Sequence, residues 1–171
     1  DFLLITHAGH CEYFATATTL LLRAAGVPAR YATGYSVQEW SPLEDNYNSV
    51  HNPGDLAEEL LSEGITAMKL WSFDRVYQRS GGHRVSWADV DDGLRPFRAI
   101  RDRVGLRMEV MLDGHGFFTL PAALRIAESM REIKPLWMED VIRPDCVDTI
   151  ADFRDRAGVP IAVSEMLVSR E

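Results

Sequence analysis

The second part of the sequence alternates between strand-like and helix-like segments, and this alternation restricts the fold more than any other feature. Strands are predicted for short apolar runs bounded by turn residues, at 65–71, 107–113, 136–139 and 159–165. Helices are predicted where apolar residues recur at three- and four-residue steps or between start and stop signals, at 55–63, 86–104, 119–133 and 147–157. Strands that alternate with helices pair in parallel through right-handed crossovers. The sequence therefore predicts an α/β fold built on a parallel sheet.

Local signals mark the ends of two of these helices. Ser86 with Asp89 three residues later resembles a capping box, and Gly105 is placed to end the helix that follows. Thr119 is predicted to cap the next helix, with Pro121 in its first turn, where the missing N–H of proline is harmless.

Three of the predicted strands end in an acidic residue, and the three acids are equally spaced. Asp113, Glu139 and Glu165 follow one another at 26 positions, since 139 − 113 equals 165 − 139. One βα unit of a TIM-type barrel has about that length, because eight units make roughly 250 residues. The acids are therefore expected at equivalent positions on the carboxyl-terminal rim of a partial (β/α) barrel.

Three carboxylates that meet at one rim repel each other unless a cation lies between them. Magnesium prefers carboxylate and water oxygens, so we expect Mg²⁺ as the cofactor bound by these acids. The alternative is that each acid is a helix cap or a solvated loop residue.

Two further side chains are expected at the same rim. Lys69 lies near the end of the preceding strand, where it would hold a substrate carboxylate or act as a base with a lowered pKa. The alternative is a lysine that extends to solvent. His115, two residues after Asp113, is a candidate general acid or base, and the alternative is a loop histidine that bonds to the backbone.

Four segments resemble the mandelate racemase and muconate lactonizing group of the enolase superfamily. They are Gly64–Trp71, Asp113–His115, Trp137–Asp140 and Pro160–Glu165, and the resemblance covers about residues 55–171. It implies a magnesium-dependent enzyme that removes a proton next to a carboxylate. Members that act on acid sugars then expel a hydroxyl as water, so the implied partner is a small sugar acid and the implied class is a lyase.

The resemblance also implies a role for each matching residue. The implied magnesium ligands are Asp113, Glu139 and Glu165. Lys69 and Trp71 would line the substrate site, and His115 lies where several sugar-acid dehydratases carry a catalytic histidine.

Two departures from the family pattern carry expectations of their own. Trp71 takes the place of the second lysine of a Lys-x-Lys pair, which favours a dehydratase over a racemase. The chain ends at Glu171, so strands six to eight, with the histidine and aspartate base pair of the family, are expected to be absent, as is most of the capping domain.

The first part of the sequence resembles a different family. Gly9–Ala15, Leu22–Arg30 and Thr33–Tyr35 are similar to a transglutaminase-like domain over about residues 1–47. The resemblance makes Cys11 the nucleophile, at the start of a predicted helix whose N-terminus would stabilise its thiolate. The partner histidine and aspartate of that family are not found, and the alternative is a buried, inert thiol.

These observations predict two unrelated parts joined at a junction. The expected division is a transglutaminase-like fragment at 1–47, a junction at 48–54 and a partial enolase-superfamily barrel at 55–171. Because the first residue is Asp1 and not methionine, the chain is expected to derive from something longer. Four barrel strands leave an open sheet edge, so self-association is expected as well.

The composition excludes some classes of partner. A formal charge of −8 without a basic stripe argues against nucleic acid. The apolar run Phe2–Ile5 is too short for a signal peptide or a membrane span, so a cytoplasmic protein is expected. Cys11 and Cys146 lie in unlike contexts, and no disulfide between them is expected.

Three functions remain open from the sequence. The first is a magnesium-dependent lyase that dehydrates a sugar acid, and the second is a cysteine acyl transferase or peptidase that uses Cys11. The third is a non-catalytic fusion fragment.

Overall fold

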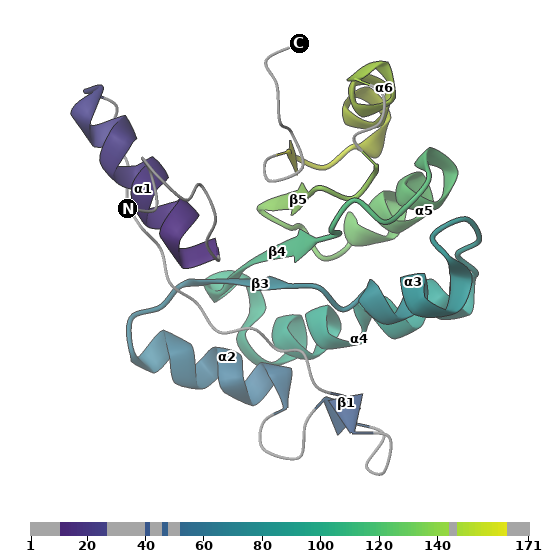
Figure 1. Cartoon of the computed structure of the whole chain (residues 1–171). Coiled ribbons are helices and arrows are strands. Elements are labelled where there is room, and N and C mark those ends of the chain that lie inside the picture. Colours follow the sequence, from purple (N-terminus) through teal and green to yellow (C-terminus); the bar gives the residue numbers. More distant parts are fainter. Residues whose placement is uncertain (1–10, 27–39, 42–45, 48–51, 144–146, 164–171) are drawn as a thin grey trace. The chain divides into compact units, whose positions relative to one another are not determined.

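The computed structural model describes residues 11–26, 40–41, 46–47, 52–143 and 147–163. The chain divides into two compact units, Asp1–Thr33 and Gly34–Glu171. Figure 1 labels the elements of both units along the chain. None of the helices described has the length and apolarity that a membrane span requires.

The first unit contains helix α1, Cys11–Ala24. Gly26 follows it with a φ of 77°, a left-handed conformation that favours glycine at the end of a helix. The helix predicted for this part of the sequence is confirmed. Tyr31, Thr33 and Tyr35 alternate in a way that predicts a strand over 30–36, and this segment lies outside the described residues.

The second unit is built on a four-stranded parallel sheet. Its strands are β3 (Ala67–Leu70), β4 (Glu109–Asp113), β5 (Trp137–Glu139) and β6 (Ile161–Ala162), in that order across the sheet. All three neighbouring pairs are parallel, so the predicted fold class is confirmed. The strands are shorter than the apolar runs suggest. Arg107, predicted as the first strand residue, instead belongs to a 3₁₀ turn, Gly105–Arg107, that follows α4.

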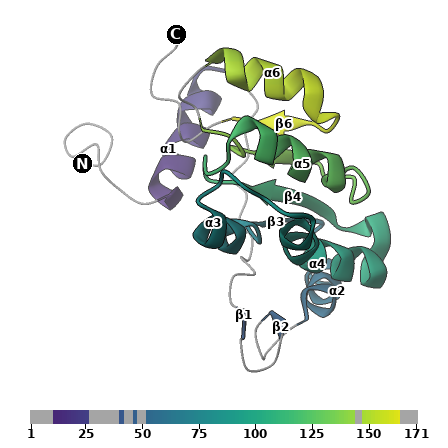
Figure 2. The same cartoon turned by 90° about the vertical axis from the view of Figure 1, so that its right-hand side faces the viewer.

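In the described part of this unit, five α-helices accompany the strands. They are α2 (Pro53–Ser62), α3 (Asp74–Ser80), α4 (Trp87–Val104), α5 (Leu120–Met130) and α6 (Val147–Ala157). Figure 2 shows α4, α5 and α6 side by side in the order of the strands they connect. A short antiparallel pair, β1 (Trp40–Ser41) with β2 (Asn46–Tyr47), precedes α2. Among the described elements of this unit, the sequence pattern did not predict helix α3, the β1–β2 pair or the 3₁₀ turn.

The core lies between one face of the sheet and the helices. Alternate strand residues point into it, because successive side chains of a strand face opposite sides. Met68, Leu70, Val110, Leu112 and Met138 are all at most 2% exposed and belong to the same apolar cluster as the buried faces of α4 and α5. Lys69, Asp113 and Glu139 lie on the other face of the sheet, because their positions alternate along the strands with those of the buried residues.

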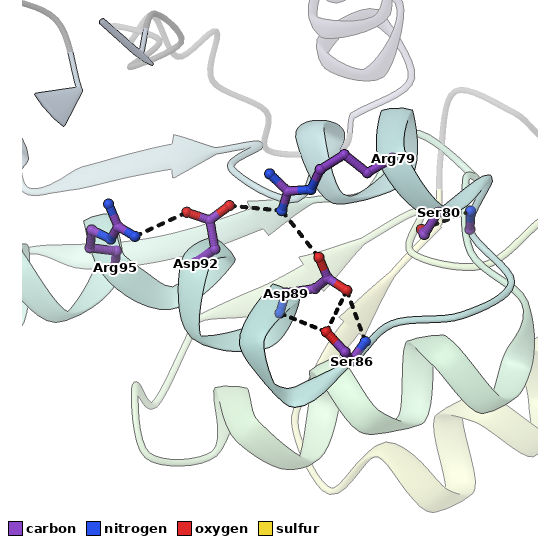
Figure 3. A network of polar contacts seen from close by, with 7 residues as sticks. Arg79, Ser80, Ser86, Asp89, Asp92 and Arg95 are labelled. Carbon is purple, nitrogen blue, oxygen red and sulfur yellow. Dashed lines mark hydrogen bonds and ion pairs between the residues drawn. The ribbon is translucent and has the colours of Figure 1, made fainter. Parts of the chain in front are cut away.

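The predicted side-chain cap is present at α4 and absent at α5. Ser86 Oγ accepts a hydrogen bond from Asp89 N at 3.1 Å while Asp89 Oδ2 accepts one from Ser86 N at 3.0 Å, which is the predicted capping box (Figure 3). Thr119 stands at the N-cap of α5 but makes no side-chain cap. Its N–H and its hydroxyl both donate to the carbonyl of Gly82, so the predicted cap is wrong and Thr119 instead ties α5 to the loop after α3.

Candidate active site at the carboxyl ends of the strands

Asp113 and Glu139 lie opposite each other at the ends of β4 and β5. The strand register pairs them directly, in line with their spacing in the sequence. Gly114 N donates to the carbonyl of Glu139 at 2.9 Å, which continues the contact one residue past β4. A Cβ on Gly114 would lie 2.6 Å from the Cα of Val141, so this close approach requires glycine. The two carboxylates are therefore fixed side by side at one rim.

The ammonium of Lys69 lies between these two carboxylates. Its Nζ is 2.7 Å from Asp113 Oδ2 and 3.2 Å from Glu139 Oε1. The side chain of Asp113 is 6% exposed and that of Glu139 is 15% exposed, so both charges are largely removed from water. The carboxylates thus converge on one point, and a positive charge occupies it.

The charge state of Lys69 differs from one of the sequence-based expectations. Burial lowers the pKa of Lys69, but the hydrogen bond to Asp113 and the negative charges of Asp113 and Glu139 together outweigh it, and the pKa is raised. A base with a lowered pKa was one reading of the sequence, and the structure contradicts it. Lys69 acts here as a fixed cation.

Glu139 also accepts a hydrogen bond from its own strand. The indole Nε1 of Trp137 donates to Glu139 Oε2 at 3.1 Å. Trp137 and Glu139 are two positions apart on β5 and therefore share a face of the sheet. Both oxygens of this carboxylate are held in place, one by Lys69 and one by Trp137.

His115 follows the end of β4 in an uncommon backbone conformation. Its φ of 49° lies in the left-handed region, between Gly114 and Gly116. Its N–H donates to Asp113 Oδ1 at 3.3 Å, and its ring Nε2 is 3.8 Å from the same oxygen. The edge of the ring meets Trp71, with the ring centroids 5.8 Å apart. The turn thus directs the imidazole back toward the carboxylates and brings together Trp71, His115 and Asp113.

Asp74 is a site residue that the sequence analysis missed. It is the first residue of α3, and its Oδ1 lies 3.1 Å from Nδ1 of His115. Burial raises the pKa of Asp74, the hydrogen bond and charge of His115 lower it, and the charge of Asp113 raises it again, with a net upward direction. An acid four residues beyond the end of β3 was the available signal, since it lies after a strand that ends at the same rim.

The donor chemistry of the rim fits a hard divalent cation. Two adjacent carboxylates are donors that suit Mg²⁺, because it is bound by one or two carboxylates plus waters or substrate oxygens. In this structure the ammonium of Lys69 occupies the point between them. Among the described residues, no group of three or more His, Cys, Asp or Glu side chains is arranged to hold a metal. The third predicted ligand, Glu165, lies outside the described residues.

The equal spacing of the acids does not extend to the register of β6. Glu139 pairs with Ala162, three positions before Glu165. The segment between β5 and β6 is therefore shorter by three residues than the one between β4 and β5. The spacing thus predicts the pairing of Asp113 with Glu139, and Glu165 lies outside the described residues.

The predicted nucleophile of the first unit is only partly described. Cys11 is the first residue of α1, but its side chain lies outside the described residues. Cys146 lies outside them entirely.

Comparison with known protein families gives one match for each part of the sequence. Residues 53–171 match the family described as enolase C-terminal domain-like, and residues 1–91 match the transglutaminase-like superfamily. The two matches overlap at residues 53–91, which contain α2, β3 and α3 of the sheet unit.

Similar proteins divide in the same way. A crystal structure of an enolase of the mandelate racemase subgroup from Agrobacterium tumefaciens is 35% identical, with a TM-score of 0.67 over 70% of this chain and 33% of its own. A D-gluconate/D-galactonate dehydratase from Picrophilus torridus is 27% identical over 73% of this chain and 32% of its own length. A protein-glutamine gamma-glutamyltransferase from Pseudomonas aeruginosa is 47% identical over 30% of this chain and 8% of its own. The chain spans about a third of the length of the sugar-acid dehydratases that it matches.

Proposed function

Because the chain belongs to the enolase C-terminal domain-like family over residues 53–171 and to the transglutaminase-like superfamily over residues 1–91, we propose that its sheet unit carries the metal-binding part of a lyase site for a sugar acid. The proposed reaction removes a proton next to the substrate carboxylate and expels a hydroxyl as water. The proposed partner is a small carboxylate, in keeping with the sugar-acid dehydratases among the similar proteins. We also propose the division at 1–47, 48–54 and 55–171.

One observation supports this proposal above the others, the convergence of two buried carboxylates on a single positive charge. Asp113 and Glu139 would hold Mg²⁺, and we propose Glu165 as the third ligand. When bound, the metal would supply positive charge that stabilises the negative charge developing on the substrate carboxylate. The carboxylates already lie side by side on rigid strands, so forming the site requires mainly that the Lys69 ammonium turn from the point between them toward the substrate.

Lys69 and His115 have separate roles in this proposal. The raised pKa of Lys69 keeps its ammonium charged, so it would bind the substrate carboxylate and not act as a base. His115 Nε2 would take up the proton next to the substrate carboxylate and then deliver it to the departing hydroxyl, which leaves as water. Asp74, at Nδ1, would then stabilise the imidazolium and hold the ring in position. Trp71 packs against the ring and would limit the access of water.

Calorimetric titration with Mg²⁺ tests the ligand assignment without requiring turnover. Glu139→Gln keeps the size of the side chain but removes one of the two described charged ligands, so magnesium binding should fall to an undetectable level. The matched control is Glu128→Gln, an exposed position on α5. Equal affinity in the wild type and in Glu139→Gln would mean that the acids are ordinary rim residues.

A second candidate function rests on Cys11. Helix α1 begins at this residue, and the N-terminus of a helix lowers the pKa of a nearby thiol. We therefore propose thiol chemistry on an acyl or amide carbonyl as the alternative. A thiol-directed reagent should then label Cys11 much faster than Cys146, and equal rates would remove this alternative. If the chain binds Mg²⁺, if the reagent labels both thiols at equal rates and if no sugar acid is turned over, the chain is the non-catalytic fusion fragment.

A further inference from the structure

A second pocket lies outside the strand-end site, between the loop that joins α3 to α4 and the start of α5. Its volume is about 760 Å³. Val85 and Ala122, which are both buried, are apolar lining residues, and most of the remaining lining is polar or charged. The basic residues that line it are Arg79, Arg84, Arg125 and His83. None of the proposed catalytic or metal-binding residues lines this pocket.

The one acidic residue of this pocket is already neutralised. Asp89 pairs with Arg79, whose Nη2 lies 3.2 Å from Asp89 Oδ1 and 2.8 Å from Asp92 Oδ2 (Figure 3). Asp89 also accepts the hydrogen bonds of the capping box from Ser86. The carboxylate of Asp89 therefore pairs with Arg79 and caps the start of α4.

The other two arginines face the pocket without an acidic partner. Arg84 is exposed and makes no ion pair with any residue that the structure describes. Arg125 donates to the carbonyl of Val85 at 2.5 Å, and its guanidinium lies 5.0 Å from the ring centroid of Trp87. In a chain with a formal charge of −8, this pocket concentrates uncompensated positive charge.

The loop that carries Arg84 is fixed at several points. Gly82 N donates to Ser80 Oγ at 3.2 Å, and Gly82 O accepts from Thr119 N at 3.0 Å. A Cβ on Gly82 would lie 2.0 Å from the carbonyl oxygen of Phe117, so the loop packs closely against the chain before α5. Because its walls are held by the fold, little conformational entropy would be lost on binding.

We propose that this pocket binds a small phosphate monoester. A guanidinium presents a planar fork of donors that matches phosphate oxygens in pairs. The two charges of a phosphate monoester match the two arginines that lack an acidic partner, whereas a single carboxylate would balance only one of them. The volume exceeds that of phosphate alone and falls in the range of small-molecule sites, so the apolar lining residues Val85 and Ala122 would contact the organic part of the ligand.

Calorimetric titration of the whole chain with glycerol 3-phosphate, at constant ionic strength, tests this proposal. Arg84→Gln should weaken binding at least tenfold, and because this side chain makes no contact that the fold depends on, the variant should remain folded. Arg84→Gln/Arg125→Gln should abolish binding. The matched control is Arg154→Gln, which removes the same charge from an exposed position on α6 and should leave the affinity unchanged.

Two further titrations test which site binds the ligand and which part of the ligand is recognised. Lys69→Met should bind glycerol 3-phosphate as the wild type does, because this pocket does not include the strand-end site; loss of binding there would place the ligand at that site and overturn the proposal. Inorganic phosphate should bind more weakly than glycerol 3-phosphate. Equal affinities would overturn the assignment of a monoester, and unchanged affinity in Arg84→Gln would overturn the pocket itself.

Discussion

At the residue scale, the position of His115 depends on one backbone angle and one carboxylate. The left-handed φ of 49° is tolerated because Gly114 and Gly116 leave room on both sides. Asp74 then fixes the ring through Nδ1. An ionised carboxylate only accepts hydrogen bonds, so in the neutral ring Nδ1 carries the proton and Nε2 is left free to act toward the rim.

This arrangement predicts the effect of substituting Asp74. Asp74→Ala removes the acceptor, so the imidazole should become a mixture of tautomers, whereas Asp74→Asn should keep the Nδ1–H form through its amide oxygen. The ¹⁵N chemical shifts of the His115 ring nitrogens measure this difference. A ring that keeps the same tautomer in Asp74→Ala would show that Asp74 does not position it.

At the element scale, the start of α4 predicts a dependence of stability on pH. The hydrogen bond from the Ser86 hydroxyl lowers the pKa of Asp89 most, burial opposes it, and the Ser86 N–H and Arg79 lower it further, below the usual 3.8. A carboxyl with a lowered folded-state pKa stabilises the fold above its unfolded pKa and loses that contribution as the pH falls through the folded value.

When the pH is lowered from 5 to 3, the urea midpoint of unfolding should therefore fall further in the wild type than in Asp89→Asn. The amide of the variant takes up no proton in this range. Arg154→Gln, remote from this cap, should follow the wild type. If the wild type and Asp89→Asn lose stability in parallel, the capping box contributes no linked proton.

The packing of α3 against α4 predicts an effect of a single methyl group. Gly93 lies on α4 beside the fully buried ring of Phe73, and a Cβ there would fall 2.4 Å from the ring. Gly93→Ala gains about 1 kcal/mol of helix propensity, but overpacking of a core costs about 1–3 kcal/mol. The free energy of unfolding should fall on balance. Phe73→Leu in the same chain should remove part of this loss, and an additive double variant would argue against the contact.

Local signals in the sequence were sufficient for some elements and not for others. The capping box of Ser86 and Asp89 was predictable because both partners lie within one helical turn. Helix α3 was missed because it has seven residues and its N-cap, Phe73, makes no side-chain cap. Thr119 was misassigned because its hydroxyl bonds to Gly82, 37 positions away, which no local pattern records.

At the scale of the whole molecule, the regular repetition of strands and helices made the sheet and the pairing of Asp113 with Glu139 predictable. The spacing of Asp113 and Glu139 gave their pairing, since equal βα units place equivalent residues at equal heights on neighbouring strands. Lys69 was expected at the rim, but its contacts to both carboxylates depend on the tilt and register of β3 against β4. The contact between Asp74 and His115 joins residues 41 positions apart, which spacing alone does not encode.

The order of the strands predicts how the molecule associates. Among the strands described, β3 and β6 each have one neighbour, and β3 is the longer of the two. Because Glu109 N donates to Thr66 O, the carbonyl of Thr66 faces β4, and the N–H and C=O of Ala67, one residue on, face the opposite side. Such an unpaired edge is a template for pairing with a second chain.

Sedimentation velocity over a range of concentrations should therefore show self-association of the wild-type chain. Ala67→Pro removes the outward N–H of β3 without touching the ladder to β4, and proline is tolerated on edge strands, so this variant should fold and associate less. Ala88→Ser, at an exposed position on α4, serves as the control and should behave as the wild type does. A wild-type chain that stays monomeric at every concentration would contradict the prediction, and equal association in Ala67→Pro would move the contact away from β3.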